Sequence, residues 1–213
     1  MSEQSSGGTG WRGSCEGWLE AAYTALIESG IDGVKILPIA NRLKLARTSF
    51  YWHLKDREAL LEALLLRWEE RSTKPLVAAA GSYAETEAEA LLNVVGCFLP
   101  TQAFDDRLEF AVRSWALQDD GVMARVQAAD AERLSALDAM LQKWGHDPVD
   151  ADVRARAIYL VQIGYISMQA RETLAVRMAR IPHYVEIYSG GARPEPREMA
   201  RFHARHGFTE GGA

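Results

Sequence analysis

The segment RTSFYWH, residues 47–53, gathers side chains suited to binding a polar partner. Arginine donates hydrogen bonds in a planar fork, hydroxyl groups donate and accept them, and large rings lie along sugars, phosphates or thymine methyl groups. If the segment is helical, Phe50 and Leu54 are four residues apart and pack inward. Thr48 and Trp52 then lie on the opposite side, so the polar-tipped side chains point outward.

The same part of the chain is locally basic within an acidic protein. The 213 residues include 24 Lys and Arg against 29 Asp and Glu, a formal net charge of −5. Between Gly33 and Arg57, six basic residues stand against a single acid, Asp56, which gives that window a net charge of +5. Phosphate contacts require such cations, so these residues favour binding to DNA through a local patch. The six are Lys35, Arg42, Lys44, Arg47, Lys55 and Arg57. Arg42 and Lys44 would serve equally well as solvated charges.

The flanking sequence predicts short helices that would present this segment. Helices are predicted over residues 16–29, 37–43, 47–53 and 56–73. Gly30 ends the first helix by allowing a left-handed backbone, Asp56 caps the last one, and Pro75 lies beyond its end. Two short helices joined by a turn at residues 44–46 have the layout of a helix-turn-helix, whose second helix enters the major groove of DNA.

A family resemblance supports this interpretation. The stretch LPIANRLKLARTSFYWHLKDREALLEAL, residues 37–64, resembles the DNA-binding domain of the tetracycline-repressor (TetR) family. The family pattern has an Ile/Leu-Ala helix, a turn, an aromatic-rich recognition helix, and a lysine followed by leucines that open the next helix. The likeness covers about residues 16–66. It implies a homodimer that binds double-stranded, pseudo-palindromic operator DNA.

Carried over by position, the resemblance implies roles for individual residues. Arg47 and its two neighbours would begin the groove contact, Tyr51 and the two residues after it would lie against the DNA backbone, and Arg57 would meet a phosphate. This chain has Lys44 where the family turn commonly has glycine, and Leu37 where the tetracycline-repressor pattern has an arginine that reads guanine. We therefore expect Arg47 to read a base, because its guanidinium suits guanine O6 and N7. The predicted DNA-binding residues are Lys35, Lys44, Arg47, Thr48, Ser49, Tyr51, Trp52, His53 and Arg57.

The rest of the chain is also predicted to be helical, which makes the fold class all-α. Helices are predicted over residues 84–98, 104–118, 121–144, 150–178 and 197–205. The predicted organisation is a disordered tail (1–13), a helix-turn-helix DNA-binding domain (14–62) and a helical regulatory, ligand-binding and dimerisation domain (63–213). The helices at 121–144 and 150–178 are apolar on more than one side, so they must be covered on more than one side. The resemblance implies that they form a four-helix interface between two subunits.

A ligand pocket in this second part is expected among aromatic and apolar side chains. Each of these side chains would suit a packed core as well as a pocket wall, and a buried Gln162 needs a hydrogen-bond partner from either a ligand or the protein. The candidates are Phe98, Phe104, Trp115, Tyr159, Gln162, Tyr165 and Met168.

Several classes of protein are disfavoured. The sequence has no nucleophile elbow, phosphate-binding glycine loop or HExxH motif, so we expect no enzyme and no cofactor. Cys15 and Cys97 are the two cysteines, and their spacing suits neither a disulfide framework nor a metal site. The start of the chain lacks a signal-peptide pattern, and the apolar stretch at residues 91–99 is much shorter than the ~20 residues that cross a bilayer. We expect a cytoplasmic protein.

These observations predict a ligand-responsive DNA-binding transcriptional regulator, a repressor if it follows the usual behaviour of the family. Its expected partners are operator DNA, a small-molecule effector of unknown identity and a second copy of the chain, with no membrane. Two alternatives remain open. One is a DNA-binding regulator without ligand control, and the other is a helical small-molecule-binding protein, or an unrecognised enzyme, that does not bind DNA.

Overall fold

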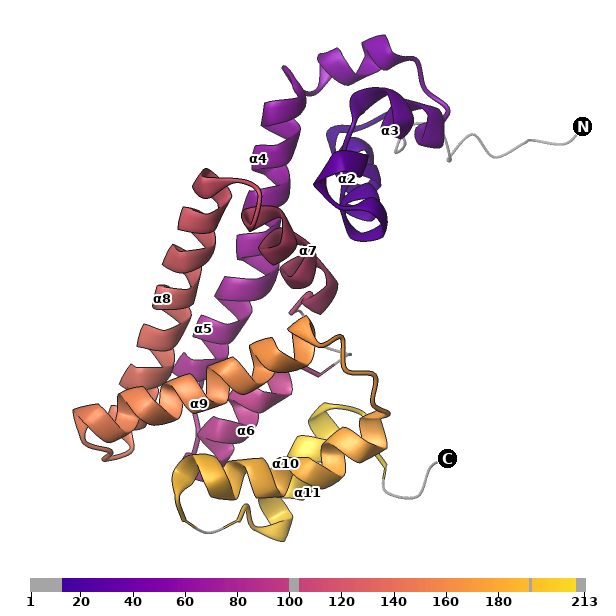
Figure 1. The fold of residues 1–213 in the computed structure, drawn as a ribbon. Coiled ribbons are helices and arrows are strands. Elements are labelled where there is room, and N and C mark those ends of the chain that lie inside the picture. The colour runs from indigo at the N-terminus through magenta and orange to yellow at the C-terminus, as the bar shows by residue number, and fades with distance from the viewer. Residues whose placement is uncertain (1–12, 100–103, 192, 210–213) are drawn as a thin grey trace, which may run out of the picture. The chain divides into compact units, whose positions relative to one another are not determined.

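The computed structural model describes residues 13–99, 104–191 and 193–209. Within those ranges the regular secondary structure consists of helices, and no residue is assigned to a strand (Figure 1). The predicted all-α fold class is therefore confirmed. The predicted disordered tail falls almost wholly on residues outside the described part. Contacts divide the chain into two compact units, one formed by the residues up to Glu69 with Arg107–Ala124, the other by Glu70–Asp106 with Arg125–Ala213. The predicted domain boundaries stay a prediction.

The first unit contains the helices predicted around the basic segment. They are α2 (Cys15–Ser29), the 3-10 turn η1 (Ile31–Gly33), α3 (Ile36–Leu43), the 3-10 helix η2 (Arg47–Trp52), α4 (Arg57–Trp68) and, later in the chain, α7 (Asp106–Ala116). Gly30 ends α2 at a φ of 67°, and the Asp56 side chain accepts a hydrogen bond from the Ala59 backbone N–H at 2.8 Å at the start of α4. Both predicted helix boundaries are confirmed.

Aromatic packing holds η2 on this unit. Phe50 and Trp18 are both fully buried, and their rings meet edge to face with centroids 5.2 Å apart. Ile39 and Ala40 of α3 are buried as well. Phe50 is thus the anchor that the helical periodicity predicts, and the rest of η2 is held in place through it.

Two adjacent residues at the end of α4 bind polar groups elsewhere in the first unit. Arg67 pairs with Glu16 and Glu20 of α2. The Trp68 indole donates to the fully buried Glu109 carboxylate at 2.6 Å. The other oxygen of Glu109 accepts from Arg113 at 2.7 Å, an ion pair between residues four apart on α7. These buried partners fix where α4 stands relative to α2 and α7.

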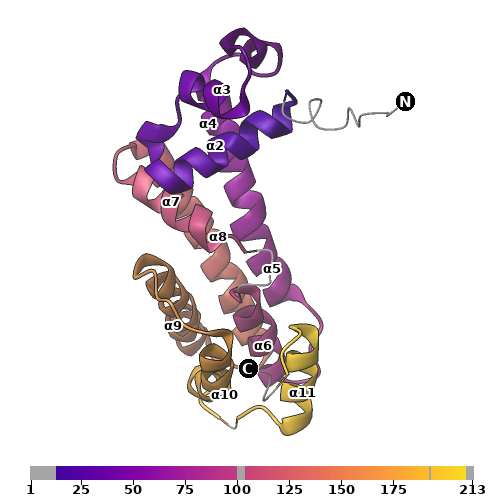
Figure 2. The same ribbon diagram turned by 90° about the vertical axis from the view of Figure 1, so that its right-hand side faces the viewer.

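The second unit is built around α6. Its helices are α5 (Lys74–Gly81), α6 (Glu87–Cys97), most of α8 (Asp120–Lys143), α9 (Pro148–Ser167), α10 (Leu174–Ser189) and α11 (Pro196–Arg205). Helix α6 packs against α5, α10 and α11, as the view in Figure 2 also shows. Leu91, Val94 and Val95 of α6 lie in the core between them.

Two predicted helix boundaries are wrong. The helix predicted to run to residue 73 changes at Glu69 into a π-helical segment (Glu69–Thr73), and α5 then begins at Lys74 with Pro75 in its first turn, where a proline N–H is not needed. The single helix predicted over residues 150–178 is two helices. Helix α9 ends at Ser167, Gln169 adopts a left-handed backbone with φ 49°, and Thr173 caps α10.

A histidine in the second unit makes the fold sensitive to pH. His146 contacts Glu87 Oε1 through Nε2 at 2.6 Å and Asp150 Oδ2 through Nδ1 at 2.7 Å. The hydrogen bond to Glu87 is the largest cause that raises the pKa of His146, Asp150 acts in the same direction, and burial opposes them. The folded-state pKa is therefore higher than the unfolded value. Protonated His146 therefore stabilises the folded state. This contribution is complete below about pH 6.5, the unfolded-state pKa, and is lost as the pH rises through the folded-state pKa.

Replacing His146 with glutamine should remove this pH dependence. As the pH rises from about 6 to about 9, the free energy of unfolding of the wild type should decrease relative to that of His146→Gln. Denaturant unfolding at several pH values measures the difference. His183→Gln, a change at an exposed histidine, is the control and should follow the wild type. Parallel curves for wild type and His146→Gln would show that the pKa of His146 is the same in the folded and unfolded states, which would contradict the prediction.

Candidate functional site

The predicted DNA-contacting residues lie on and around η2, a 3-10 helix rather than the α-helix predicted over this segment. Trp52 is 80% exposed and Tyr51 is 48% exposed, unusual values for large aromatic side chains. Thr48 and His53 are exposed as well. The Arg47 guanidinium donates to the Tyr51 hydroxyl at 3.2 Å, which orients both side chains on one surface. The structure brings these five residues together.

Ser49 lies differently from its neighbours. It is buried, and its hydroxyl donates to the Ala46 carbonyl at 2.8 Å. The bond runs from the side chain back to the residue before η2, so the hydroxyl is satisfied within the protein. Its contribution to the surface is therefore to hold the start of η2.

The basic side chains around η2 are available to an anion. Lys35 and Lys44 are exposed, and neither they nor Arg47 forms an ion pair with any described residue. Arg42, by contrast, pairs with Glu28 at 2.7 Å. Lys44 adopts a left-handed backbone at the end of α3, with φ 59° and ψ 41°, which explains why glycine is common at this position in the family pattern.

Arg57 is engaged within the protein. Its Nε donates to the Val34 carbonyl at 2.7 Å and its Nη2 donates to the Ile31 carbonyl at 3.2 Å. These carbonyls belong to the connection between α2 and α3. The side chain therefore ties the start of α4 to that connection, a structural role beside the phosphate contact predicted from the sequence.

Arg57→Met should accordingly destabilise the protein. Two hydrogen bonds from a half-buried charged group are lost, so we expect the free energy of unfolding to decrease by about 2 kcal/mol. Denaturant unfolding measures it, with Lys55→Met as the control at an exposed cation two residues away, which should cost little. Unchanged stability with a large loss of DNA affinity would instead make Arg57 a phosphate contact alone.

The predicted ligand-binding residues do not form one site. Phe98 and Phe104 pack on each other with centroids 4.7 Å apart, and Met168 is 81% exposed at the end of α9. Trp115 belongs to the first unit, whereas the other candidates belong to the second. The Tyr159 hydroxyl is already engaged in the core.

The Tyr159 contacts form a buried polar cluster. Its hydroxyl donates to Asp130 at 2.6 Å and accepts from Arg133 at 2.8 Å. Arg133 is fully buried and also donates to the hydroxyl of Thr73, the last residue of the π-helical segment, at 3.0 Å. Tyr159 thus compensates a buried guanidinium, which is a structural task.

Gln162 and Tyr165 share a small cavity of about 20 Å³ in the second unit. The Tyr165 and Tyr184 hydroxyl oxygens are 3.0 Å apart, and Arg180 reaches the Tyr165 hydroxyl at 3.4 Å. The lining residues are Val95, Leu99, Gln162, Tyr165, Arg177, Arg180, Ile181 and Tyr184. The α10 members of this set were not among the predicted residues, and the segment 179–189, which holds three of these four, was not predicted to be helical.

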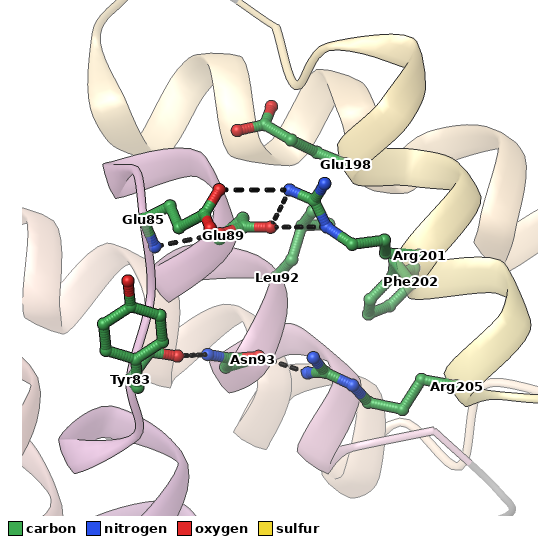
Figure 3. Close-up of a pocket in the computed structure, with 9 residues that line it drawn as sticks. All are labelled: Tyr83, Glu85, Glu89, Leu92, Asn93, Glu198, Arg201, Phe202 and Arg205. Carbon is green, nitrogen blue, oxygen red and sulfur yellow. Dashed lines mark hydrogen bonds and ion pairs between the residues drawn. The ribbon is translucent and has the colours of Figure 1, made fainter.

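A larger cavity of about 250 Å³ lies between α6 and α11 (Figure 3). Its charged groups largely pair with each other. Arg201 binds Glu89 and lies 3.9 Å from Glu85, and Arg205 binds the Asn93 side chain. These contacts dock α11 on α6, so we interpret them as packing interactions.

Among the described residues, no group of three or more His, Cys, Asp and Glu side chains could hold a metal ion. Over the same ranges, none of the helices combines the length and apolar character needed to span a bilayer.

Known proteins resemble the helix-turn-helix segment in sequence and most of the chain in fold. Residues 19–64 match the model of the bacterial regulatory proteins of the tetR family. Tetracycline repressor protein class D of Escherichia coli is 36% identical over 66 residues, which cover 31% of this chain and 30% of the repressor, and class H of Photobacterium damsela subsp. piscicida matches equally. The matched stretch thus spans less than a third of these curated relatives.

Solved structures extend the likeness over most of the fold. Salmonella enterica GusR superposes with a TM-score of 0.61 at 16% identity and covers 83% of this chain and 91% of its own. The fatty acid degradation regulator FadR of Bacillus halodurans has a TM-score of 0.62 at 16% identity and covers 90% of this chain and 100% of its own. The helix-turn-helix segment is thus similar in sequence to the tetR family of bacterial regulatory proteins, and most of the chain is similar in fold to these solved structures.

Proposed function

We propose that the protein is a transcriptional regulator that binds double-stranded DNA through η2 and the exposed residues beside it. The proposal rests on one surface, where Arg47, Tyr51 and Trp52 are exposed around the buried Phe50. A protein without a partner at this surface has little reason to expose an indole ring to this extent. The unpaired cations nearby supply phosphate contacts, and the predicted residues at positions 47–53 supply contacts to the groove.

We propose that the active form is a homodimer. Val149, Val153 and Leu160 of α9 are 75%, 59% and 59% exposed in the single chain, at spacings of four and seven residues. They follow one side of the helix, and an exposed apolar stripe of this kind marks an interface. Small exposed side chains on α8, at Ala128 and Ala139, allow a second helix to approach closely. A dimer would present two η2 segments to half-sites about 34–36 Å apart, one turn of DNA.

We propose that a small molecule bound in the second unit controls DNA binding. A ligand that prefers the dimer conformation with the wrong half-site spacing shifts the population to that conformation and releases the DNA. A tenfold loss of operator affinity requires a preference of only about 1.4 kcal/mol. Release on ligand binding would make the protein a repressor, and its place of action is the cytoplasm.

Fluorescence anisotropy tests the DNA-binding proposal. The probe is labelled DNA from immediately upstream of the protein's own gene, and the competitor is a scrambled duplex, at low and physiological salt. We expect tighter binding to the upstream DNA than to the scrambled duplex. The affinity should fall as the salt concentration rises, and a plot of log affinity against log salt should have a slope of about −0.9 for each phosphate contacted. Binding to neither duplex at low salt would contradict the proposal and favour a helical small-molecule-binding protein.

One observation favours a second candidate, a DNA-binding regulator without ligand control. The cavity at Gln162 and Tyr165 has a volume of only about 20 Å³, because the protein's own side chains fill the space. Under this alternative, DNA affinity would not change with any small molecule that the protein binds.

A further inference from the structure

An arginine on α10 lines the small cavity without an acidic partner. The guanidinium of Arg177 lies over the Tyr165 ring, 5.3 Å from the centroid, and forms no ion pair with a described residue. Arg180, three residues further along, pairs with Glu172. The charges of Arg180 and Glu172 therefore cancel, and Arg177 leaves an excess positive charge at the cavity.

Tyr165, Tyr184 and Gln162 line the same cavity and carry neutral hydrogen-bond donors, whereas Tyr188 is a neighbour of Tyr184 and is not part of the lining. Tyr184 shares a hydrogen bond with Tyr165 and stacks on Tyr188 with centroids 5.8 Å apart. Tyr188 is 2% exposed, and its hydroxyl has no well-formed hydrogen bond in the described structure. Burial raises the pKa of Tyr188, and the hydrogen bond with Tyr165 raises the pKa of Tyr184, so both phenols keep their protons at neutral pH and remain donors. Gln162, also buried, adds an amide.

The remaining lining residues of the cavity are apolar. They are Val95, Leu99 and Ile181, and all three are buried. A cation, several donors and an apolar wall suit a ligand with one negatively charged group and a hydrocarbon body. A neutral ligand would leave the charge of Arg177 without a partner in a partly dehydrated place.

We propose that this cavity binds a small organic acid in its carboxylate form, with the carboxylate between Arg177 and the tyrosine hydroxyls and the hydrocarbon body against Val95 and Ile181. Only the ligand's role as the effector rests on the proposed function. Charge-assisted hydrogen bonds from the guanidinium and the phenols are stronger than the contacts that these donors make now.

Entry of the ligand requires the arginine side chains to move. The present cavity of about 20 Å³ holds roughly one water molecule. Arg177 is half-buried and the Arg180 side chain is 50% exposed, so both can rotate towards solvent and enlarge the cavity. The cavity in Figure 3 has room already, but Glu85, Glu89 and Glu198 outnumber Arg201 and Arg205 along its wall, so it would repel a carboxylate.

Binding of matched acid and amide probes to the full-length protein tests the proposal. Benzoate and octanoate are compared with benzamide and octanamide, at equal ionic strength, by thermal unfolding and isothermal titration calorimetry. We expect the acids to raise the melting temperature and the amides to leave it unchanged, because a ligand stabilises the state that it binds. Arg177→Gln should weaken acid binding about tenfold, or about 1.4 kcal/mol, and Arg177→Lys should restore most of it.

Arg171→Gln is the matched control at an exposed arginine just before α10 and should bind the acids as the wild type does. Tyr165→Phe, which keeps the ring under Arg177 and removes one hydroxyl, should weaken acid binding and remain folded. Equal binding of acids and amides, unchanged acid affinity in Arg177→Gln, or no stabilisation by either acid would overturn the proposed site.

The same samples separate the site from the proposed function. Acid binding that leaves DNA affinity unchanged would keep the carboxylate site and refute its role as the effector site. DNA binding that is intact in a protein to which neither acid binds would refute the site and leave the regulator proposal standing.

Discussion

Replacing Leu160 with aspartate should halve the mass of the protein in solution and weaken its binding to operator DNA by roughly a hundredfold or more. Leu160 is 59% exposed on the apolar stripe of α9 that we propose as the dimer interface. A carboxylate there would have to lose its water without gaining a hydrogen-bond partner, which costs several kcal/mol per subunit. In a symmetric dimer the cost is incurred twice, because the same surface is used by both copies. Light scattering gives the mass and fluorescence anisotropy gives the affinity.

The loss of DNA affinity follows from the loss of the dimer. In a dimer, binding of one η2 to its half-site holds the other near the second half-site at a high effective concentration. A monomer has one half-site contact only. Leu117→Asp makes the same change at a leucine that is 79% exposed and lies outside α8 and α9, so it should leave mass and affinity unaltered. A wild type that is already monomeric at micromolar concentration, or a Leu160→Asp protein that stays dimeric, would exclude the α9 stripe as the interface.

The helices of the first unit could be predicted because their boundaries are local. Gly30 and Asp56 act on backbone groups within a few residues of themselves, so their effect is visible in the sequence. The break between α9 and α10, by contrast, has no such local signal in the sequence. Apolar residues continue through it at helical spacing, and what ends α9 is the left-handed turn at Gln169. Pro182 then suggests a loop, but it lies inside α10, whose Ile181 and Val185 are held in the core.

The orientation of the candidate DNA surface could also be predicted from local spacing, whereas the positions of Ser49 and Arg57 could not. The spacing of Phe50 and Leu54 orients η2 and so places Trp52 outward. The 3-10 winding of η2 and the burial of Ser49 have no clear sequence signal, and the carbonyls bound by Arg57 lie 23 and 26 residues earlier in the chain. The cavity on α10 could not be predicted, because its arginines and tyrosines converge only through the packing of α9, α6 and α10.

Replacing Arg47 with alanine should weaken binding to the cognate operator by about 1–3 kcal/mol while changing binding to random DNA much less. Arg47 is exposed at the start of η2, and its hydrogen bond to the Tyr51 hydroxyl holds the guanidinium at the surface that we propose to face the groove. A guanidinium that donates two hydrogen bonds to guanine O6 and N7 discriminates between bases, whereas a contact to phosphate does not. Anisotropy titrations with the upstream operator and a scrambled duplex measure both losses.

Lys35→Ala is the matched control for the Arg47 substitution, because Lys35 is an exposed cation without an ion pair among the described residues. If Lys35 contacts phosphate alone, its removal should weaken both duplexes equally and reduce the slope of affinity against salt by about 0.9. Tyr51→Phe should have an intermediate effect on the operator, since it removes the hydroxyl that orients Arg47 and keeps the ring. Should Arg47→Ala behave as Lys35→Ala does, with equal losses on both duplexes, Arg47 would be a phosphate contact, and sequence would have to be read by Thr48 and the aromatic residues that follow it.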